Sequence, residues 1–177
     1  MRAHISKAAV VLLLASAGAA CDDEAVVAPA RPSAVEAHAS VSGSPRDRDA
    51  IQQILDTFDQ NWGVDAAAYA AQYADADFVG PNGANLTTAA QILQLYTNIF
   101  PAFAGTTRRS QIRALTFLTG TVAVLDIDTR ITGALPPFVT PWQPGMTRAL
   151  EKNVLVKRGG EWRIVQHQQT LVAPGVP

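Results

Sequence analysis

The chain has 177 residues, which is enough for one domain once an N-terminal segment is set aside. Its 14 basic and 15 acidic side chains nearly cancel, so the composition disfavours nucleic-acid binding through a basic surface. The single cysteine excludes an intrachain disulfide.

Residues 1–20 are typical of a secretory signal peptide, with Arg2 and Lys7 flanking a short apolar run and small residues at the end. The sequence Ala-Gly-Ala-Ala-Cys at 17–21 resembles a bacterial lipobox, in which the cysteine is lipidated. We therefore expect export to the bacterial cell envelope and a lipid anchor at Cys21. Ordinary cleavage that leaves Cys21 free is the alternative.

Residues 21–44 form a predicted linker that tethers the domain to the membrane. From Ala25 to Ser44 the segment is rich in Ala, Val, Pro and Ser and has no sustained apolar period, so it cannot bury enough surface to order itself. His38 lies in this linker and receives no catalytic role. The folded domain is expected at 45–173.

Three helices are predicted in the first half of the domain. Ser44 and Pro45 are typical of a helix start, and Gly63 ends that helix. Asp65 is expected to cap a short second helix that carries Tyr69 and Tyr73 on one face. Thr87 or Thr88 caps a third helix that ends near Pro101. The first and third helices have apolar stripes, formed by Ile51, Ile54, Leu55, Phe58 and Trp62 and by Ile92, Leu95, Tyr96, Ile99 and Phe100.

The second half of the domain has the period of strands. A hairpin is predicted over 77–87, around Pro81-Asn82-Gly83, and strands over 110–118, 121–132, 147–157 and 161–171. This order favours an α+β fold in which the helices cover one face of a curved antiparallel sheet. Residues 133–145 contain four prolines and several large apolar side chains. They are expected to form a flap over a pocket or, in the favoured interpretation, an arm across a dimer partner.

The last strand alternates between apolar and polar side chains. With a period of two, Trp162, Ile164, Gln166 and Gln168 share one face, which we take as the inner row of a pocket. His167 is then expected on the opposite face.

The layout from Asp47 to Thr170, ending in Leu155-Val156-Lys157-Arg158-Gly159-Gly160-Glu161-Trp162-Arg163-Ile164, resembles SnoaL-like domains of the nuclear-transport-factor-2-like superfamily. The subgroup it resembles is the SgcJ/EcaC type, a domain of unknown function. The resemblance implies a cone-shaped roll, also called cystatin-like, with a pocket at its open end and a homodimer formed through the outer face of the sheet. The family's recurrent polar position corresponds to Gln168, and His167 stands where an aromatic residue is usual.

Several kinds of chemistry are disfavoured. The domain has one histidine, one serine and no cysteine, which argues against a metal cluster and against a Ser or Cys nucleophile. No Gly-x-Gly-x-x-Gly follows a strand, so no nucleotide cofactor is expected. Acid–base catalysis remains, with Asp126, Asp128 and His167 as candidates. The alternatives are a solvated or dimer-forming face for the aspartates and simple packing for His167.

We therefore predict a membrane-tethered domain that binds a small apolar or mixed ligand. The alternative is an isomerase-like or cyclase-like enzyme that acts on a small carbonyl compound. The predicted ligand-contacting residues are aromatic and amide side chains: Trp62, Tyr69, Tyr73, Phe78, Tyr96, Phe100, Trp162, Gln166 and Gln168.

Overall fold

The computed structural model describes residues 42–81, 83–133, 147–173 and 175. The predicted signal peptide, most of the linker with Cys21, and the proline-rich segment lie outside these residues. In the part that is described, no helix is long and apolar enough to cross a membrane.

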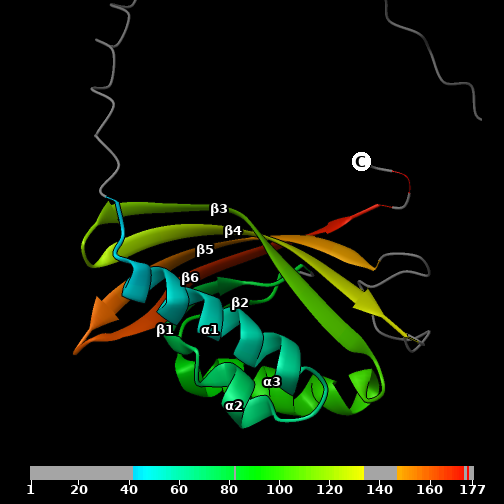
Figure 1. Ribbon diagram of the computed structural model, residues 1–177. Helices are drawn as coiled ribbons and strands as arrows, with labels where there is room; N and C mark the ends of the chain where they lie inside the picture. The colour runs from blue at the N-terminus through cyan, green and yellow to red at the C-terminus, as the bar shows by residue number, and fades with distance from the viewer. Residues whose placement is uncertain (1–41, 82, 134–146, 174, 176–177) are drawn as a thin grey trace, which may run out of the picture. The chain divides into compact units, whose positions relative to one another are not determined.

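The described residues form three helices and a six-stranded sheet (Figure 1). In chain order the elements are α1 (Pro45–Asn61), α2 (Ala66–Ala70), β1 (Tyr73–Val79), β2 (Asn85–Leu86), α3 (Ala89–Phe103), β3 (Thr107–Thr119), β4 (Val122–Thr132), β5 (Arg148–Arg158) and β6 (Glu161–Val172). The helices pack on one face of a curved sheet, which confirms the predicted α+β class.

The strand order is β2-β1-β6-β5-β4-β3. Four of the five neighbouring pairs are antiparallel, as predicted, and β1 runs parallel to β6, a pairing that the sequence did not indicate. The parallel pair arises because α3 carries the chain from the β2 edge to the opposite edge before β3 begins. The meander β3-β4-β5-β6 then returns across the sheet to β1.

The helix starts lie where the sequence predicts them. The Ser44 side chain accepts a hydrogen bond from the backbone N–H of Asp47, and Asp65 accepts from Ala67 and Ala68. Thr88 forms a capping box with Gln91. These side chains satisfy N–H groups that the first helical turns leave without a partner.

Two helix ends differ from the prediction. The second helix ends at Ala70, so Tyr73 begins β1 and does not continue the helix. The third helix runs through Pro101 to Phe103. Proline removes one backbone hydrogen bond, but the rings of Phe100 and Phe103 pack 5.4 and 4.8 Å from that of Trp62, and this packing holds the last turn in place.

The turn after α1 requires glycine. Gly63 has φ +68°, and a Cβ at this position would lie 2.7 Å from the carbonyl oxygen of Phe103. Both the backbone conformation and the close approach of α3 therefore exclude a side chain.

The start of α1 is tied to the far hairpin of the sheet. The Asp47 carboxylate accepts from Lys157 Nζ at 2.6 Å and from Trp162 Nε1 at 3.0 Å. Lys157 is the main reason that the pKa of Asp47 lies far below its usual range, and Trp162 and Ser44 add to the effect.

A β-bulge corrects the predicted faces of β6. Val154 pairs with Gln166 and Leu155 pairs with Ile164, so Val165 is an extra residue in the strand. The alternation shifts by one position there. Trp162, Ile164 and His167 consequently lie on the helix-covered face and are buried, whereas Gln166 and Gln168 are exposed on the other face.

Arg108 lies at the centre of a buried polar network on the helix-covered face. Its guanidinium donates to Asp59 of α1 at 3.0 Å, to Thr129 of β4 at 3.1 Å and to Glu151 of β5 at 3.0 and 3.1 Å. Ser110 completes the set at 2.6 Å and itself donates to Asp59. Burial disfavours the charge on Arg108, but Glu151, Tyr69 and Asp59 together raise the pKa of Arg108 above its usual range.

Replacing this guanidinium should destabilise the fold strongly. Arg108→Met leaves Glu151 and Asp59 without their cation in the interior, and we expect the free energy of unfolding to fall by about 3 kcal/mol or more in urea titrations. The matched control is Arg148→Met, which breaks a partly exposed pair with Asp128 and should lower the same quantity by about 1 kcal/mol or less. Equal losses in the two variants would contradict the role given to Arg108.

Candidate functional site

Three strands place one row of side chains across the interior. In the sheet register Phe78 of β1 lies opposite His167 of β6, and His167 lies opposite Asn153 of β5. The imidazole stacks on the Phe78 ring at 4.5 Å, and its Nδ1 lies 2.8 Å from Asn153 Oδ1. His167 is 3% exposed and Asn153 is fully buried.

Burial decides the charge of His167. Removal from water lowers the pKa of His167 to about 4, with Glu151 acting in the opposite direction and Arg108 in the same direction. The imidazole is therefore neutral at neutral pH. In the assigned orientation of the Asn153 carboxamide, Nδ1 carries the proton and donates to Oδ1, which leaves the lone pair of Nε2 free.

Three buried polar atoms around this row have no hydrogen bond of ordinary geometry among the described residues, although the Tyr73 and Tyr96 hydroxyls are close enough to affect each other's pKa. The three atoms are the Tyr73 hydroxyl, Asn153 Nδ2 and His167 Nε2. Because buried polar groups are normally paired, such atoms in one region indicate a place for water or for a polar group of a ligand. Two of them, the hydroxyl and the amide nitrogen, can donate, and the imidazole Nε2 can accept.

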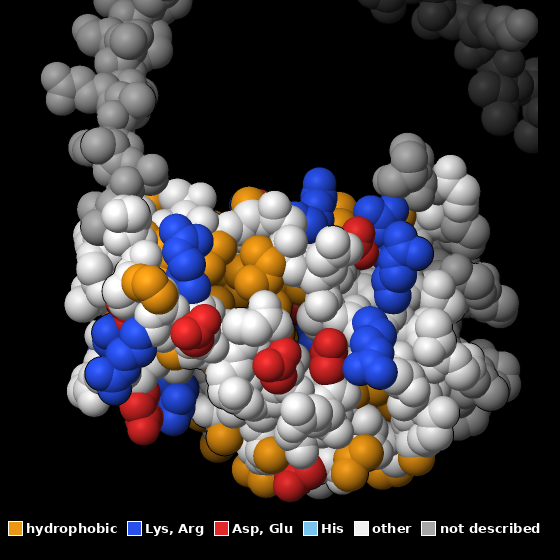
Figure 2. Space-filling model, in the orientation of Figure 1, with side chains coloured by type: hydrophobic (Ala, Val, Ile, Leu, Met, Phe, Trp, Pro, Cys, Tyr) orange, Lys and Arg blue, Asp and Glu red, His pale blue; other side chains and the backbone are white. Residues whose placement is uncertain are grey.

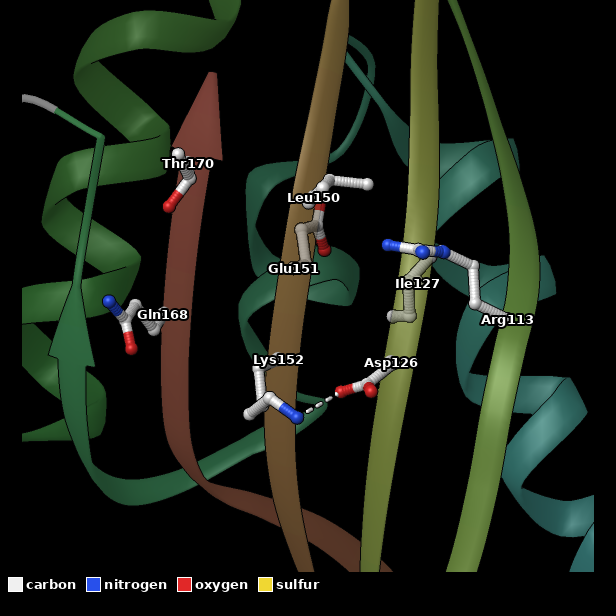
Figure 3. Close-up of a pocket in the computed structure, with 8 residues that line it drawn as sticks. All are labelled: Arg113, Asp126, Ile127, Leu150, Glu151, Lys152, Gln168 and Thr170. Carbon is white, nitrogen blue, oxygen red and sulfur yellow. Dashed lines mark ion pairs between the residues drawn. The ribbon is translucent and has the colours of Figure 1, made fainter. Parts of the chain in front are cut away.

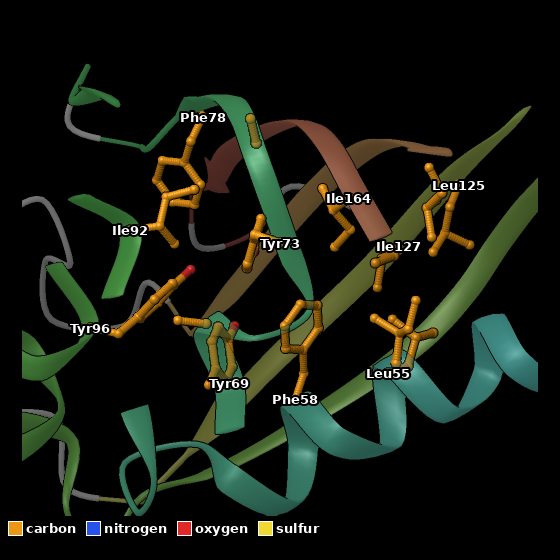
Figure 4. Close-up of a cluster of buried hydrophobic side chains, with 14 of the residues drawn as sticks. Leu55, Phe58, Tyr69, Tyr73, Phe78, Ile92, Tyr96, Leu125, Ile127 and Ile164 are labelled. Atoms are coloured by element: carbon orange, nitrogen blue, oxygen red, sulfur yellow. The ribbon is translucent and has the colours of Figure 1, made fainter. Parts of the chain in front are cut away.

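Aromatic rings surround these polar atoms. Figure 4 shows Tyr69, Tyr73 and Tyr96 close together beside Phe58 of α1. The Tyr73 ring lies 5.6 Å from Phe58, 5.8 Å from His167 and 6.3 Å from Tyr96. Burial raises the pKa values of Tyr69, Tyr73 and Tyr96 well above the usual range, so all three phenols stay protonated.

Glu151 links this cluster to the Arg108 network. Its side chain accepts from Arg108 and, at 3.3 Å, from Gln169 of β6. Burial raises the pKa of Glu151, but Arg108, His167 and Thr129 together outweigh burial and bring it below its usual value. An ionised carboxylate therefore lies inside the domain, with its charge compensated by Arg108.

The structure brings together most of the aromatic residues named from the sequence. Trp62, Tyr69, Tyr73, Phe78, Tyr96 and Phe100 are all buried in the interior cluster. Trp162 is also buried but packs against Phe117 at 5.9 Å and donates to Asp47, at the hairpin end of β6.

The candidate aspartates lie on the opposite face of the sheet from His167. As predicted, Asp126 and Asp128 share a face, but it is the outer face (Figure 3 shows Asp126). Asp126 pairs with Lys152 at 2.7 Å, and Asp128 pairs with Arg148 at 2.8 Å. Gln168 and Asp126 line a shallow hollow there, with a cavity volume of about 340 Å³.

Arg108, Glu151 and Asn153 were not predicted from the sequence. For the last two a signal exists, since Glu151 and Asn153 occupy inward positions between Ala149 and Leu155, which are fully buried. For Arg108 the sequence gives no such signal, because the neighbouring Arg109 is the same residue type and nothing local shows which of the two points inward. Among the described residues, no three His, Cys, Asp or Glu side chains come together as ligands for a metal ion.

The depressed pKa of His167 predicts a loss of stability in mild acid. The unfolded chain binds a proton near the ordinary histidine pKa of 6.5, whereas the folded chain binds it only near pH 4, so stability falls as pH drops through this window. We expect a loss of ~3 kcal/mol in the free energy of unfolding between these two pH values. Urea titrations at a series of pH values measure it.

His167→Phe is the control, because it keeps a ring against Phe78 and removes the titrating group. The variant should show only the decline that carboxylates such as Glu151 cause as pH falls through their lowered pKa values. If the free energy of unfolding falls equally in the wild type and in His167→Phe between pH 7 and pH 5, the imidazole is not buried and neutral.

Comparisons with known proteins agree with this architecture. The family model for a SnoaL-like domain matches residues 47–174. No curated protein matches the sequence.

Three solved structures illustrate the likeness. A domain of unknown function with a cystatin-like fold from Nostoc punctiforme has a TM-score of 0.63 and 20% identity, covering 75% of this chain and 81% of that one. A putative scytalone dehydratase from Novosphingobium aromaticivorans has a TM-score of 0.56 and 14% identity, with coverage of 72% and 85%. A hexachlorocyclohexane dehydrochlorinase of type 2 has a TM-score of 0.57 and 18% identity, with coverage of 74% and 96%. At these identities the likeness establishes the fold, and with the family match over most of the described domain, the chain belongs to the SnoaL-like domain family.

Proposed function

We propose that the domain binds a small apolar or mixed molecule at its interior cluster. The observation that carries this proposal is a set of three buried polar atoms, Tyr73 Oη, Asn153 Nδ2 and His167 Nε2, which have no hydrogen bond of ordinary geometry in the described part of the chain and lie among buried aromatic rings. A carbonyl oxygen of the ligand would accept from Tyr73 and Asn153, and a donor group would face His167. The aromatic side chains would bury the apolar part of the ligand.

Acid–base catalysis on a small carbonyl compound is the second candidate. The neutral His167, held by Asn153 through Nδ1, leaves Nε2 free to take a proton from the carbon next to a carbonyl. The electron pair would move into the carbonyl, and the Tyr73 hydroxyl would donate to the resulting oxyanion. Two proteins of similar fold are named a dehydratase and a dehydrochlorinase, and such eliminations also begin with removal of a proton by a base. Asp126 and Asp128, on the outer face, lie apart from this cluster.

Copurification tests the binding proposal. Small molecules extracted from the purified full chain are identified and counted by mass spectrometry. Tyr73→Phe removes one hydroxyl and keeps the ring, so we expect about a 10-fold drop in ligand affinity with the fold intact. The matched control, Gln166→Ala on the outer face, should retain the ligand. If nothing copurifies with the wild type, or if the two variants retain equal amounts, the binding proposal fails.

A deuterium readout of the same complex separates binding from catalysis. In D2O, a His167 base should exchange the proton next to the carbonyl of the bound molecule. His167→Gln should bind it without exchange. Exchange that persists in His167→Gln would exclude His167 as the base but leave the binding proposal in place.

We also propose that the protein is an exported lipoprotein of the SgcJ/EcaC type, anchored to the membrane at Cys21 and dimeric. The lipobox-like sequence at 17–21 and the linker composition support the anchor. The apolar end of the outer sheet face, with Leu118 at 56% exposure beside Val122, Val124, Val154 and Val156, supports contact with a second copy.

Fractionation and sedimentation test this second proposal together. We expect the wild-type chain in the membrane fraction and Cys21→Ser in the soluble fraction as a dimer. Ala20→Ser, which keeps the cysteine, is the control and should remain with the membrane. A Cys21→Ser chain that stays in the membrane would rule out the lipid anchor, and a monomer would rule out the dimer.

A further inference from the structure

The strand-rich half of the domain carries more positive charge than the neutral domain suggests. Residues 107–172 contain nine Lys and Arg but four Asp and Glu, whereas residues 45–79 contain two basic and seven acidic side chains. Figure 2 shows acidic side chains following α1 on the helical side. The domain therefore has an acidic helical half and a basic sheet half.

Arginines are concentrated on three neighbouring strands of the outer face of the sheet. Arg109 of β3 lies opposite Arg130 of β4, which in turn lies opposite Arg148 of β5. Like charges directly opposite each other destabilise a sheet. Arg148 is paired with Asp128, but among the described residues Arg109, Arg113 and Arg130 take part in no ion pair.

A hollow of about 340 Å³ on the outer face is lined by one of these arginines, Arg113. Figure 3 shows the Arg113 guanidinium reaching across β4 toward Leu150, with Lys152 and Asp126 at one end and Gln168 and Thr170 on β6. Four of these side chains, Arg113, Lys152, Gln168 and Thr170, can donate hydrogen bonds. The Asp126 carboxylate is held by Lys152 at 2.7 Å.

We infer that this hollow is a second ligand site, separate from the interior cluster, which takes a small hydroxylated organic anion. Arg113 binds the carboxylate or phosphate group, because its guanidinium has a planar set of donors and forms no ion pair within the described ranges of the chain. Gln168 and Thr170 contact hydroxyl groups, and Leu150 contacts the carbon skeleton. The Asp126–Lys152 pair closes the hollow and offers both an acceptor and a donor.

Calorimetric titration of the full chain at about 150 mM salt tests the inference. The probes are glucose 6-phosphate, glucuronate and glucose, which share a sugar and differ in the phosphate, carboxylate or absence of charge. We expect one or both anions to bind with a Kd below about 1 mM, and glucose to bind at least about 10-fold more weakly. Whichever anion binds more tightly shows whether the site prefers a phosphate or a carboxylate group.

Substitutions distinguish specific binding at the hollow from general electrostatic attraction to the positively charged face. Arg113→Gln should weaken anion binding by about 10-fold. Gln168→Leu should weaken it severalfold. The matched control is Arg109→Gln, which removes the same charge from the same strand and face but lies four residues away, roughly 13 Å along the strand and beyond the screening length. It should change binding by less than about twofold.

Arg113, Gln168 and Arg109 are exposed, so these substitutions should leave the unfolding midpoint unchanged. If neither anion binds at about 10 mM, the inference is wrong. A second copy of the chain that covers the hollow would give this result. Equal weakening by Arg113→Gln and Arg109→Gln also overturns it. The ligand at the interior cluster should stay bound in Arg113→Gln, so the two sites are tested independently.

Discussion

The buried guanidinium of Arg108 is the constraint on which the rest of the interior depends. A charged group that is 1% exposed must have its donors satisfied, and its partners come from α1, β3, β4 and β5. These bonds hold the first helix against strands that lie about 50 residues later in the chain. They also keep Glu151 ionised next to the imidazole of His167. The same network therefore orders the fold and sets the electrostatics of the interior cluster.

The two faces of the sheet provide two different chemical environments from the same strands. Inward positions of β5 and β6 bring a neutral imidazole, an amide and an ionised carboxylate into an aromatic interior, where hydrogen-bonding groups need complete pairing. Outward positions of these strands and of β3 and β4 bring exposed cations, two ion pairs and amides into contact with solvent. Salt concentration and pH therefore affect the charged groups on the two faces differently. Burial protects the interior charges from screening, whereas ions in solution weaken attraction at the outer face.

Much of the fold could be predicted from the sequence because it depends on local signals. Ser44, Asp65 and Thr88 cap the helices through contacts within a few residues, and strands β3 to β6 follow long runs of period two. The site was predicted less well. The aromatic residues were identified from their type and spacing, but the inner row of β6 was assigned to Gln166 and Gln168. Because Val165 is unpaired, the alternation of faces reverses after it, so His167 points inward and the two glutamines point outward.

The sequence by itself determined the α+β class, the helix starts, the four long strands and the aromatic residues that fill the interior, because each depends on periodicity or on neighbours in the chain. Only the tertiary structure decided that β1 lies parallel to β6, that the bulge at Val165 turns His167 inward, and that Arg108 meets Asp59 and Glu151. Each of these depends on pairing between segments far apart in sequence. The register of such pairs is set by packing and hydrogen bonding across the whole sheet, and no local pattern encodes it.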